Sequence, residues 1–311
     1  MTLFARPILT NGATHPAQQF RMLVRDLARG AEGVTQGDDL KVTQRSTPGS
    51  GITVSDGSAV IKGRVNTFQG HYAEANIGAQ NVDIAATSAS PRSDMVILRI
   101  EDPEYEGTLN PAVDQVAYFQ VISNVSSSAT AIPDGRTGIP LARIDIPAST
   151  STITDAYIKD LRAVANPRRD RNLNIASPSG ISTELSGTSG TFANFTTAPG
   201  WSIAVPDWAT TAKVTIIVAQ IRYSTAAFFG GIRATFGTSL TVQPVNLDDN
   251  QTGIRRGTVA LADNLTIPAA YRATTQTLRI QAAGYNPNPG KVSVDASTTL
   301  IADLEFFEAP R

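Results

Sequence analysis

The chain has 311 residues, the length of about two domains. Hydrophobic residues make up 41% and charged residues 17%, which is too apolar for intrinsic disorder, and the absence of cysteine excludes disulfides and thiolate metal sites. The formal net charge of -1 lacks the basic excess of a nucleic-acid-binding protein, and no run approaches the roughly 20 apolar residues of a membrane span. The N-terminus lacks the apolar core of a signal peptide, so we expect synthesis in the cytoplasm and neither a nucleic-acid partner nor membrane insertion.

An amphipathic helix is predicted near the N-terminus. Apolar residues recur there at three- and four-residue spacing from Phe20 to Ala28 and form one face. Thr14 is the candidate N-cap, Pro16 suits the first turn, and Gly30 suits the end of the helix. Because one helix cannot bury such a face alone, we expect it to pack on a sheet or on a neighbouring subunit.

Short segments rich in valine, isoleucine and threonine follow, and turn residues separate them, a pattern that predicts strands. These segments are LKVTQRS, GITVSDGSAVIKGRV, NVDIAA, DMVILRIED, QVAYFQVISN and LARIDIP. DMVILRI has adjacent apolar residues at its centre, which indicates a strand buried on both faces. Residues 133–138, PDGRTG, are predicted to form a loop.

The segment ITDAYIKDLRAVANPRRDRN, in the middle of the chain, is interpreted as a joint between two β modules. Ile158, Leu161 and Ala165 share a face at helical spacing, and Thr154 or Asp155 suits an N-cap. We therefore expect one or two helical turns that end before the following proline.

The next stretch, residues 166–180, contains two prolines and no strong periodicity, which predicts a linker between domains. Three arginines lie in it: Arg168, Arg169 and Arg171. We interpret them as a solvated linker rather than a phosphate-binding site. They are expected to point outward or to pair with Asp160 and Asp170.

Residues 181–311 again predict short strands with turns between them. The segments are WSIAVP, AKVTIIVAQIRYS, GGIRATFG, LTVQPVNL, GTVALADNLTIP, QTLRIQAAG and KVSVDASTTLIADLEFFE. Their even spacing favours an antiparallel β-sandwich of jelly-roll type. In the second segment the period-two alternation places Val214, Ile216, Val218 and Gln220 on one face.

The predicted fold is therefore mainly β. Residues 1–165 are expected to form an N-terminal module with one amphipathic helix. Residues 166–180 are the predicted linker, with a short helix before it, and residues 181–311 are the predicted C-terminal antiparallel sandwich.

Little in the sequence points to catalysis. The histidines are His15, interpreted as a cap or surface residue, and His71, interpreted as a strand-end residue. The acidic segments EDPEYEG, residues 101–107, and LDDNQTG, residues 247–253, are interpreted as solvated turns, and a cation site is the weaker alternative for each. We predict no enzymatic activity, no metal and no cofactor.

Aromatic residues are scarce, and three of them are candidate glycan contacts: Trp208, Tyr285 and Trp201. An exposed ring can stack on the apolar face of a sugar. For both tryptophans we favour the alternative that they close the ends of the sandwich core. Tyr285 is the better candidate for exposure, because Pro287 and Pro289 stiffen its loop.

Four pieces of the first half resemble, in their order and spacing, the N-terminal module of tail-tip and baseplate proteins of tailed bacteriophages. They are GVTQGDDLKV, GITVSDGSAVIKG, PRSDMVILRIED and GIPLARIDIPASTSTITDAYIKDLR, and the resemblance covers roughly residues 15–165. The second half, with VPDWATTAKVTIIV, IPAAYRATTQTLRIQA and STTLIADLEFF, is similar to C-terminal β-sandwich domains of minor tail proteins from phages of actinobacteria.

The resemblance implies a virion structural protein at the tail tip or baseplate that forms a homotrimer. It implies that the N-terminal module docks onto other tail-tip or baseplate proteins and that the C-terminal domain attaches to the host envelope, with a cell-surface glycan as the candidate ligand. It brings no catalytic residues. The alternative is a virion-associated glycan depolymerase that would use carboxylates such as Glu104 and Asp248 on host cell-wall polysaccharide.

Overall fold

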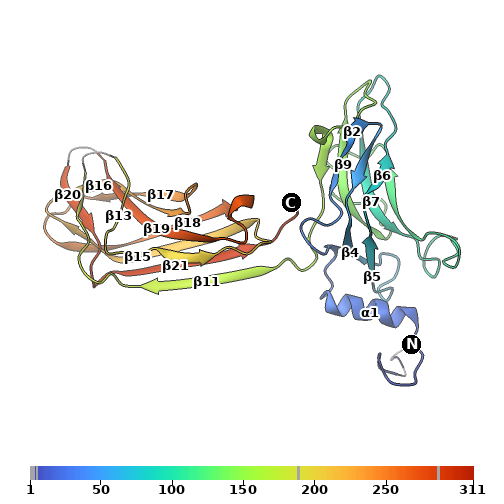
Figure 1. Cartoon of the computed structure of the whole chain (residues 1–311), viewed down its shortest axis with the longest axis horizontal. Coiled ribbons are helices and arrows are strands. Elements are labelled where there is room, and N and C mark those ends of the chain that lie inside the picture. The colour runs from blue at the N-terminus through green and yellow to red at the C-terminus, as the bar shows by residue number, and fades with distance from the viewer. Residues whose placement is uncertain (1–3, 5, 188–189, 286–287) are drawn as a thin grey trace. The chain divides into compact units, whose positions relative to one another are not determined.

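The structure is a computed structural model that describes residues 4, 6–187, 190–285 and 288–311. The chain divides into two compact units, one formed by Met1–Pro167 with Ala309–Arg311 and the other by Arg168–Glu308. The fold is mainly β, with one N-terminal α-helix and antiparallel sheets, as the sequence predicts. Figure 1 labels the elements along the chain.

The N-terminal unit consists of one α-helix, one short 3₁₀ helix and ten strands. Their bounds are α1 Ala17–Leu27, β1 Gly33–Val34, β2 Val42–Gly49, β3 Gly51–Val54, β4 Gly57–Lys62, β5 His71–Asn76, β6 Gln80–Asp83, β7 Arg92–Ile100, β8 Ala117–Ile122, β9 Gly138–Ile146, η1 Asp155–Tyr157 and β10 Ile158–Asp160. The strands form three sheets with the orders β1-β4-β5, β2-β3-β6 and β10-β9-β7-β8.

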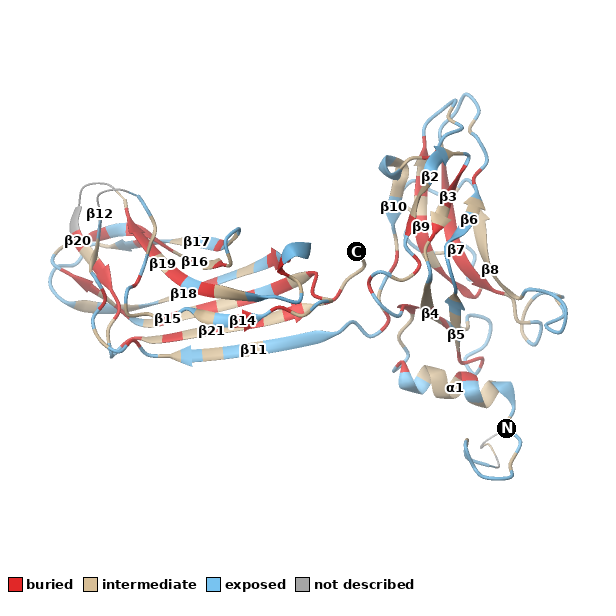
Figure 2. Ribbon diagram, viewed as in Figure 1, coloured by how far each residue is buried: buried red, intermediate tan, exposed pale blue. Residues whose placement is uncertain are grey.

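One hydrophobic core joins the three sheets of this unit. Ile61, Ile52 and Leu141 each come from a different sheet, and all three are fully buried in the same cluster. Strand β7 lies between β8 and β9 and is buried at every position after Arg92, so the prediction of a strand buried on both faces is confirmed. Figure 2 shows this strand in red at the centre of the unit.

The predicted N-terminal helix is present as α1, but its start differs from the prediction. Pro16 occupies the N-cap position in an extended conformation, and no side chain caps the helix, so the expected cap from Thr14 is wrong. At the other end the amide of Gly30 donates to the carbonyl of Arg25 at 2.9 Å, and the helix stops where predicted.

The short helix predicted between Thr154 and the following proline is wrong. Only η1 is helical, and β10 then pairs antiparallel with β9. The next residues run extended beside β1, with Val34 N–H donating to Ala163 O and Ala165 N–H donating to Val34 O, both at 2.8 Å. Two sheet edges thus supply hydrogen bonds that a helix of one or two turns, with its costly nucleus, would have to replace.

The close approach of this segment to β1 depends on Gly33. Its φ is 136°, and a Cβ atom placed there would lie 2.1 Å from the carbonyl oxygen of Ala163. Any side chain would therefore collide with backbone as well as adopt an unfavourable conformation.

The last three residues of the chain complete the N-terminal unit. The Arg311 amide donates to Gly37 O at 3.0 Å, and its guanidinium pairs with Asp38 at 2.6 Å. The Arg162 guanidinium, which is fully buried, donates to the carbonyls of Gly37, Asp39 and Arg311 at 2.6 to 3.2 Å. One buried cation therefore ties its own segment to residues 37–39 and to the last residue, Arg311.

The C-terminal unit is a β-sandwich. Its elements are β11 Arg169–Ala176, β12 Leu185–Gly187, β13 Ala193–Asn194, β14 Trp201–Ala204, β15 Thr211–Ser224, β16 Phe228–Phe236, β17 Leu240–Asp249, β18 Arg255–Thr266, η2 Ala269–Tyr271, β19 Thr275–Gly284, β20 Asn288–Ser293 and β21 Thr299–Phe307. A six-stranded sheet has the order β11-β21-β15-β20-β12, with β18 also paired to β15. A five-stranded sheet has the order β13-β19-β16-β17, with β14 also paired to β19.

Both sheets of this unit face one core. Val214 and Leu304 from the first sheet and Ile232 and Ile280 from the second are buried in the same cluster. Consecutive strands from β17 to β20 alternate between the sheets, as in antiparallel sandwiches with Greek-key connections.

The alternation predicted along β15 is correct up to Val218 and wrong for Gln220. A register shift lies between Ala219 and Ile221, and Gln220 has a φ of 61° and is exposed. This bulge inserts one residue, so Ile221 takes the buried face instead.

The predicted linker, residues 166–180, is largely an ordered strand. All eight residues of β11 pair antiparallel with β21, and the C-terminal unit begins at Arg168. Most side chains of β11 are exposed, so backbone pairing at a sheet edge, rather than burial, holds it. An edge strand of this kind lacks the hydrophobic alternation by which strands are recognised.

The three arginines of this segment point outward, one of the two expected arrangements, and pair with carboxylates near the end of the chain rather than with Asp160 and Asp170. The pairs are Arg168–Glu308 at 2.6 Å, Arg169–Glu305 at 3.9 Å and Arg171–Asp303 at 2.6 Å. Asp160 pairs instead with Arg162. The β11–β21 register brings these charges together, so they reinforce the edge of the sheet.

Two polar contacts fix the periphery of the sandwich. The hydroxyl of Tyr271 accepts hydrogen bonds from the backbone N–H groups of Thr238 and Ser239, both at 2.8 Å, in the β16–β17 turn. Burial alone would raise the pKa of Tyr271, but hydrogen bonds from Ser239 and Thr238 lower it to about 8.

The second contact is made by Glu184, the residue that precedes β12. Hydrogen bonds from Ser224 and Arg222 lower the pKa of Glu184 to about 2.

Candidate functional site

Helix α1 is attached to the N-terminal unit by a buried arginine. Arg21 is 9% exposed, and its guanidinium reaches the loop after β7. Its contacts are Gln69 O at 2.8 Å, Glu104 Oε2 at 2.7 Å, Tyr105 Oη at 3.1 Å and Asp102 Oδ2 at 3.3 Å, with the rings of Tyr72 and Tyr105 at 5.5 and 5.2 Å. One attachment of the helix is therefore a buried cation surrounded by carboxylates and aromatic rings.

The acidic segment 101–107 forms the predicted loop, but the interpretation of a solvated turn is wrong. Its carboxylates accept hydrogen bonds from two half-buried tyrosines and two buried arginines: Glu101 from Tyr118, Asp102 from Tyr72, Glu104 from Arg21 and Glu106 from Arg99. Burial, with the neighbouring Asp102 carboxylate, raises the pKa of Tyr72 well above its ordinary value, so this hydroxyl stays protonated. Asp102, Glu104 and Glu106 are structural counterions of Arg21 and Arg99.

The apolar stripe of α1 is only partly covered by its own unit. Arg21 and Ala28 are buried on the side that packs near β5, whereas Phe20 is 45% and Leu27 is 73% exposed, and Leu23 is half-buried. Figure 2 shows most of α1 as intermediate or exposed. The helix was expected to pack on a sheet or on a neighbouring subunit; it does pack against β5, with Arg21 and Ala28 buried, but Phe20 and Leu27 of the apolar face stay exposed.

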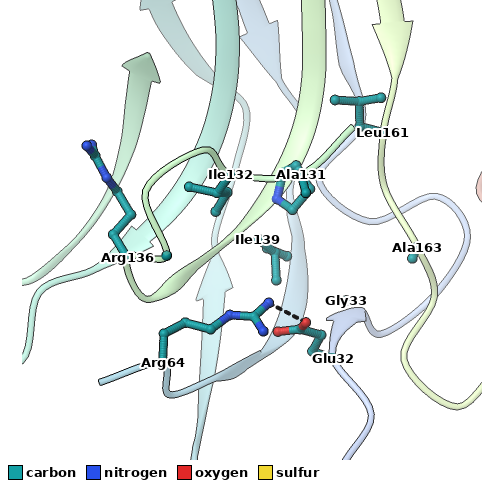
Figure 3. A pocket seen from close by; sticks show the side chains of 11 residues that line it. Glu32, Gly33, Arg64, Ala131, Ile132, Arg136, Ile139, Leu161 and Ala163 are labelled. Carbon is teal, nitrogen blue, oxygen red and sulfur yellow. Dashed lines mark hydrogen bonds and ion pairs between the residues drawn. The ribbon is translucent and has the colours of Figure 1, made fainter. Parts of the chain in front are cut away.

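A mainly apolar pocket of about 380 Å³ lies elsewhere in the N-terminal unit. Its lining includes Ile132, Ile139 and Leu161, with an ion pair between Arg64 and Glu32 at one side. Figure 3 shows these two charged groups facing each other. Arg136 also lines the pocket and pairs with Asp134, so every lining charge is neutralised and the pocket offers shape and apolar contact rather than chemistry.

The strongest candidate site is an aromatic cluster on the outer face of the five-stranded sheet. The Tyr285 ring contacts Phe192 and Phe229 edge to face, with centroid distances of 6.3 and 5.7 Å. The Arg233 guanidinium lies 4.2 Å from the centroid of Phe192. Gly231 makes room for Tyr285, since a Cβ atom there would lie 2.3 Å from the tyrosine hydroxyl.

Polar side chains border this cluster. Arg233 donates to Gln281 at 2.8 Å, and Gln281 donates to Asn194 at 3.1 Å. Asp248 is exposed and stands opposite Phe229 in the β16–β17 register, so both side chains project from the same face. A half-exposed aromatic surface edged by amide, guanidinium and carboxylate groups can bind the apolar face of a sugar and hydrogen-bond its hydroxyls. We call Tyr285, Phe192, Phe229 and the bordering Arg233, Gln281, Asn194 and Asp248 the aromatic face.

The three predicted glycan contacts do not form one site. Trp201 and Trp208 are half-buried and pack against the sandwich core, and Trp201 pairs with Leu278 toward the opposite end of β19 from Tyr285. Trp208 also lies 5.3 Å from the Arg168 guanidinium. Tyr285 follows β19 and is half-buried; Pro289 falls in β20, and Pro287 lies outside the described residues.

Phe229 is the main residue of the aromatic face that sequence reasoning missed. The signal was the pair Phe228 and Phe229 at the start of a strand, because successive strand residues point to opposite faces. Phe228 is buried in the core, so Phe229 points outward and is 38% exposed.

The remaining candidates contribute no catalytic arrangement. His15 contacts Gln19 at 3.2 Å, and His71 begins β5, the strand-end position that was predicted. Glu104 and Asp248, the carboxylates of the depolymerase alternative, lie in different units. Among the described residues, no group of three or more histidines and carboxylates is arranged to hold a metal ion, and no helix is long and apolar enough to cross a membrane.

The chain matches no family model, and no curated protein matches its sequence. Solved structures show distant likeness. The structure of the infectious bursal disease virus Gx strain has a TM-score of 0.28 and 11% identity, covering 90% of this chain and 71% of that chain. The structure of infectious bursal virus-derived T=1 particles has a TM-score of 0.25 and 13% identity, covering 94% of this chain and 83% of that chain. The structure of a Bacillus thuringiensis Cry1Da tryptic core variant has a TM-score of 0.17 and 12% identity, covering 98% of this chain and 57% of that chain. Values this low establish no common family.

Proposed function

We propose that this chain is a structural subunit of a virion that assembles through its N-terminal unit and attaches to a host surface through its C-terminal sandwich. The sequence resemblance to tail-tip and baseplate proteins supports placement at the tip of a phage tail, as a homotrimer that contacts other baseplate proteins. The proposal includes no enzymatic step.

The observation that carries the proposal is the orientation of α1. The buried Arg21 fixes the helix, and Phe20 and Leu27 are left exposed, with Leu23 half-buried between them. A surface stripe of this kind is stabilised when a second apolar surface covers it. In the proposed homotrimer, α1 of a neighbouring copy or its adjoining surface covers this stripe.

Assembly is tested by native mass spectrometry and light scattering of the purified chain. We expect a trimer for the wild type and a shift to monomer for the double variant Phe20→Ser, Leu27→Ser. The matched control is Ile77→Ser, because Ile77 is 97% exposed in the same unit, away from α1 in sequence. A wild-type chain that stays monomeric at micromolar concentration would contradict the proposed assembly.

Attachment is assigned to the aromatic face. Its rings provide a stacking surface, and Arg233, Gln281 and Asp248 provide polar groups at its edge. The proposed ligand is a glycan of the host envelope, because stacking and multiple hydroxyl contacts suit a sugar better than a folded protein surface.

The attachment test measures binding of the chain to a panel of bacterial cell-wall polysaccharides. Phe229→Ala should weaken binding about tenfold, which corresponds to about 1.4 kcal/mol of lost contact. Phe68→Ala is the control, since Phe68 is 64% exposed in the N-terminal unit. Equal affinity of both variants would remove the aromatic face from the proposal, and release of new reducing ends would favour the depolymerase alternative.

A further inference from the structure

His71 is buried without hydrogen-bond partners. It is 2% exposed, and within the described part of the chain neither ring nitrogen has a partner. A neutral imidazole carries one donor and one acceptor, and a protonated imidazole carries two donors. Buried polar atoms without partners are rare, and they point to a bound water or ion at that position.

His71 is one of the residues that line a pocket rich in cationic groups. His71 is the first residue of β5 and stands opposite Lys62 in the β4–β5 register, so both side chains project from the same face of the sheet. Helix α1 packs against β5 and contributes Arg25 to the pocket. The pocket measures about 300 Å³, and its other polar lining comes from Arg64, Asn66 and Thr67.

The charges at this pocket do not cancel. Arg25 pairs with Asp26, and Arg64 pairs with Glu32, but neither carboxylate lines the pocket. No ion pair of the Lys62 ammonium appears among the described residues. Three cationic groups and two neighbouring carboxylates leave an excess of one positive charge, next to a histidine that needs a partner.

We propose that this pocket binds a phosphate group. The Lys62 ammonium and the Arg25 guanidinium contribute charged donors, and a His71 ring nitrogen contributes an N–H. These donors come from a helix and from two strands, so they suit a tetrahedral anion with several acceptor oxygens better than a planar carboxylate. The site is separate from the aromatic face and does not depend on the proposed attachment function.

The test uses the imidazole signals of the whole chain, which contains only two histidines. Inorganic phosphate is titrated at constant ionic strength against sodium chloride, and the ring ¹⁵N and ¹H shifts are followed by NMR. We expect a saturable change at His71 with little change at His15, which contacts Gln19 outside the pocket. A phosphate response no larger than the chloride response, or an equal response of both histidines, would overturn the proposal.

Two charge-matched variants locate the site. Lys62→Gln should weaken phosphate binding about tenfold, since it removes a charge-assisted hydrogen bond. Lys41→Gln makes the same charge change at another exposed position of the N-terminal unit and should leave the affinity unchanged. If both variants lose affinity equally, the effect is general electrostatics and the site is refuted.

The source of the phosphate is distinguished by a second titration with glycerol 3-phosphate. Tighter binding of the ester than of inorganic phosphate would support recognition of a phosphate carried on a larger molecule. Tighter binding of inorganic phosphate would support capture of the free ion.

Discussion

Replacing Arg21 with methionine tests whether one buried cation holds α1 in place. Methionine keeps an unbranched apolar stem but removes every hydrogen bond of the guanidinium. The change leaves the Gln69 carbonyl and the Asp102 carboxylate without this donor, and Asp102 is only 16% exposed. Glu104 is 51% exposed and can turn to water, so its pair contributes less.

The free energy that holds α1 on the unit should fall by about 3 kcal/mol, the lower end of the range for removing one partner of a buried charged pair. If α1 detaches locally, its backbone amides should exchange with solvent roughly 150-fold faster, since each factor of ten corresponds to 1.36 kcal/mol. Hydrogen–deuterium exchange of the intact chain, followed at α1 and at β7, measures this directly. The β7 amides should change much less, because that strand lies in the core.

Arg25→Met is the control on the same helix. Arg25 pairs with the adjacent Asp26, and the two side chains are 35% and 64% exposed, so its removal should change α1 exchange by less than about 0.5 kcal/mol. Equal acceleration in the two variants, or α1 exchange within about threefold of wild type in Arg21→Met, would show that the contacts of Arg21 do not anchor the helix.

Three further substitutions test other contacts of the fold. Tyr271→Phe should destabilise the C-terminal unit by about 2 kcal/mol, because two backbone N–H groups lose their acceptor. In a titration of tyrosine ionisation followed by ultraviolet absorbance, the variant should lack the one of seven tyrosines that ionises with a pKa of about 8. This lowered pKa also means that the contribution of the phenolate to stability is complete above pH 10 and is lost as the pH falls through 8. Glu184→Gln should lower the free energy of unfolding, measured with urea at pH 7, by about 1 kcal/mol, a small value because the side chain is partly exposed. The difference from wild type should shrink as the pH falls from 4.5 through 2, since the pKa of Glu184 in the folded protein is lowered to about 2. Gly33→Ala should lower the free energy of unfolding by at least about 2 kcal/mol because of the positive φ, and by more because the new Cβ atom would collide with Ala163. A melting temperature equal to that of the wild type would contradict the requirement for glycine.

The sequence was most informative where one physical effect dominates. DMVILRI has adjacent apolar residues at its centre, which predicts a strand buried on both faces, and the alternation in β15 marks the inner face of a sandwich as far as Val218. The bulge at Gln220 shifts that alternation and has no signal in the residue types themselves. Strand β11 was missed because its edge pairing uses backbone hydrogen bonds, which leave no hydrophobic pattern.

Long-range contacts decided the other differences. The periodicity of α1 shows which face is apolar, but the buried side is set by Arg21, whose partner Glu104 lies 83 residues away. Tyr285 was a candidate from its type and loop, whereas Phe229 and Asp248 join it only once the strand order is known. A surface assembled across strands is therefore hard to predict from a single sequence.

The path of the chain through its two units has a consequence for cleavage and for synthesis. The backbone leaves the first unit after Pro167 and returns at Ala309, so a cut before Ala309 leaves residues 1–167 covalently joined to the sandwich, whereas a cut after Pro167 leaves the sandwich covalently joined only to residues 309–311 of the first unit. On the ribosome, the contact between Arg311 and Asp38 forms only after the whole sandwich has been made. The first unit thus begins folding first and finishes last.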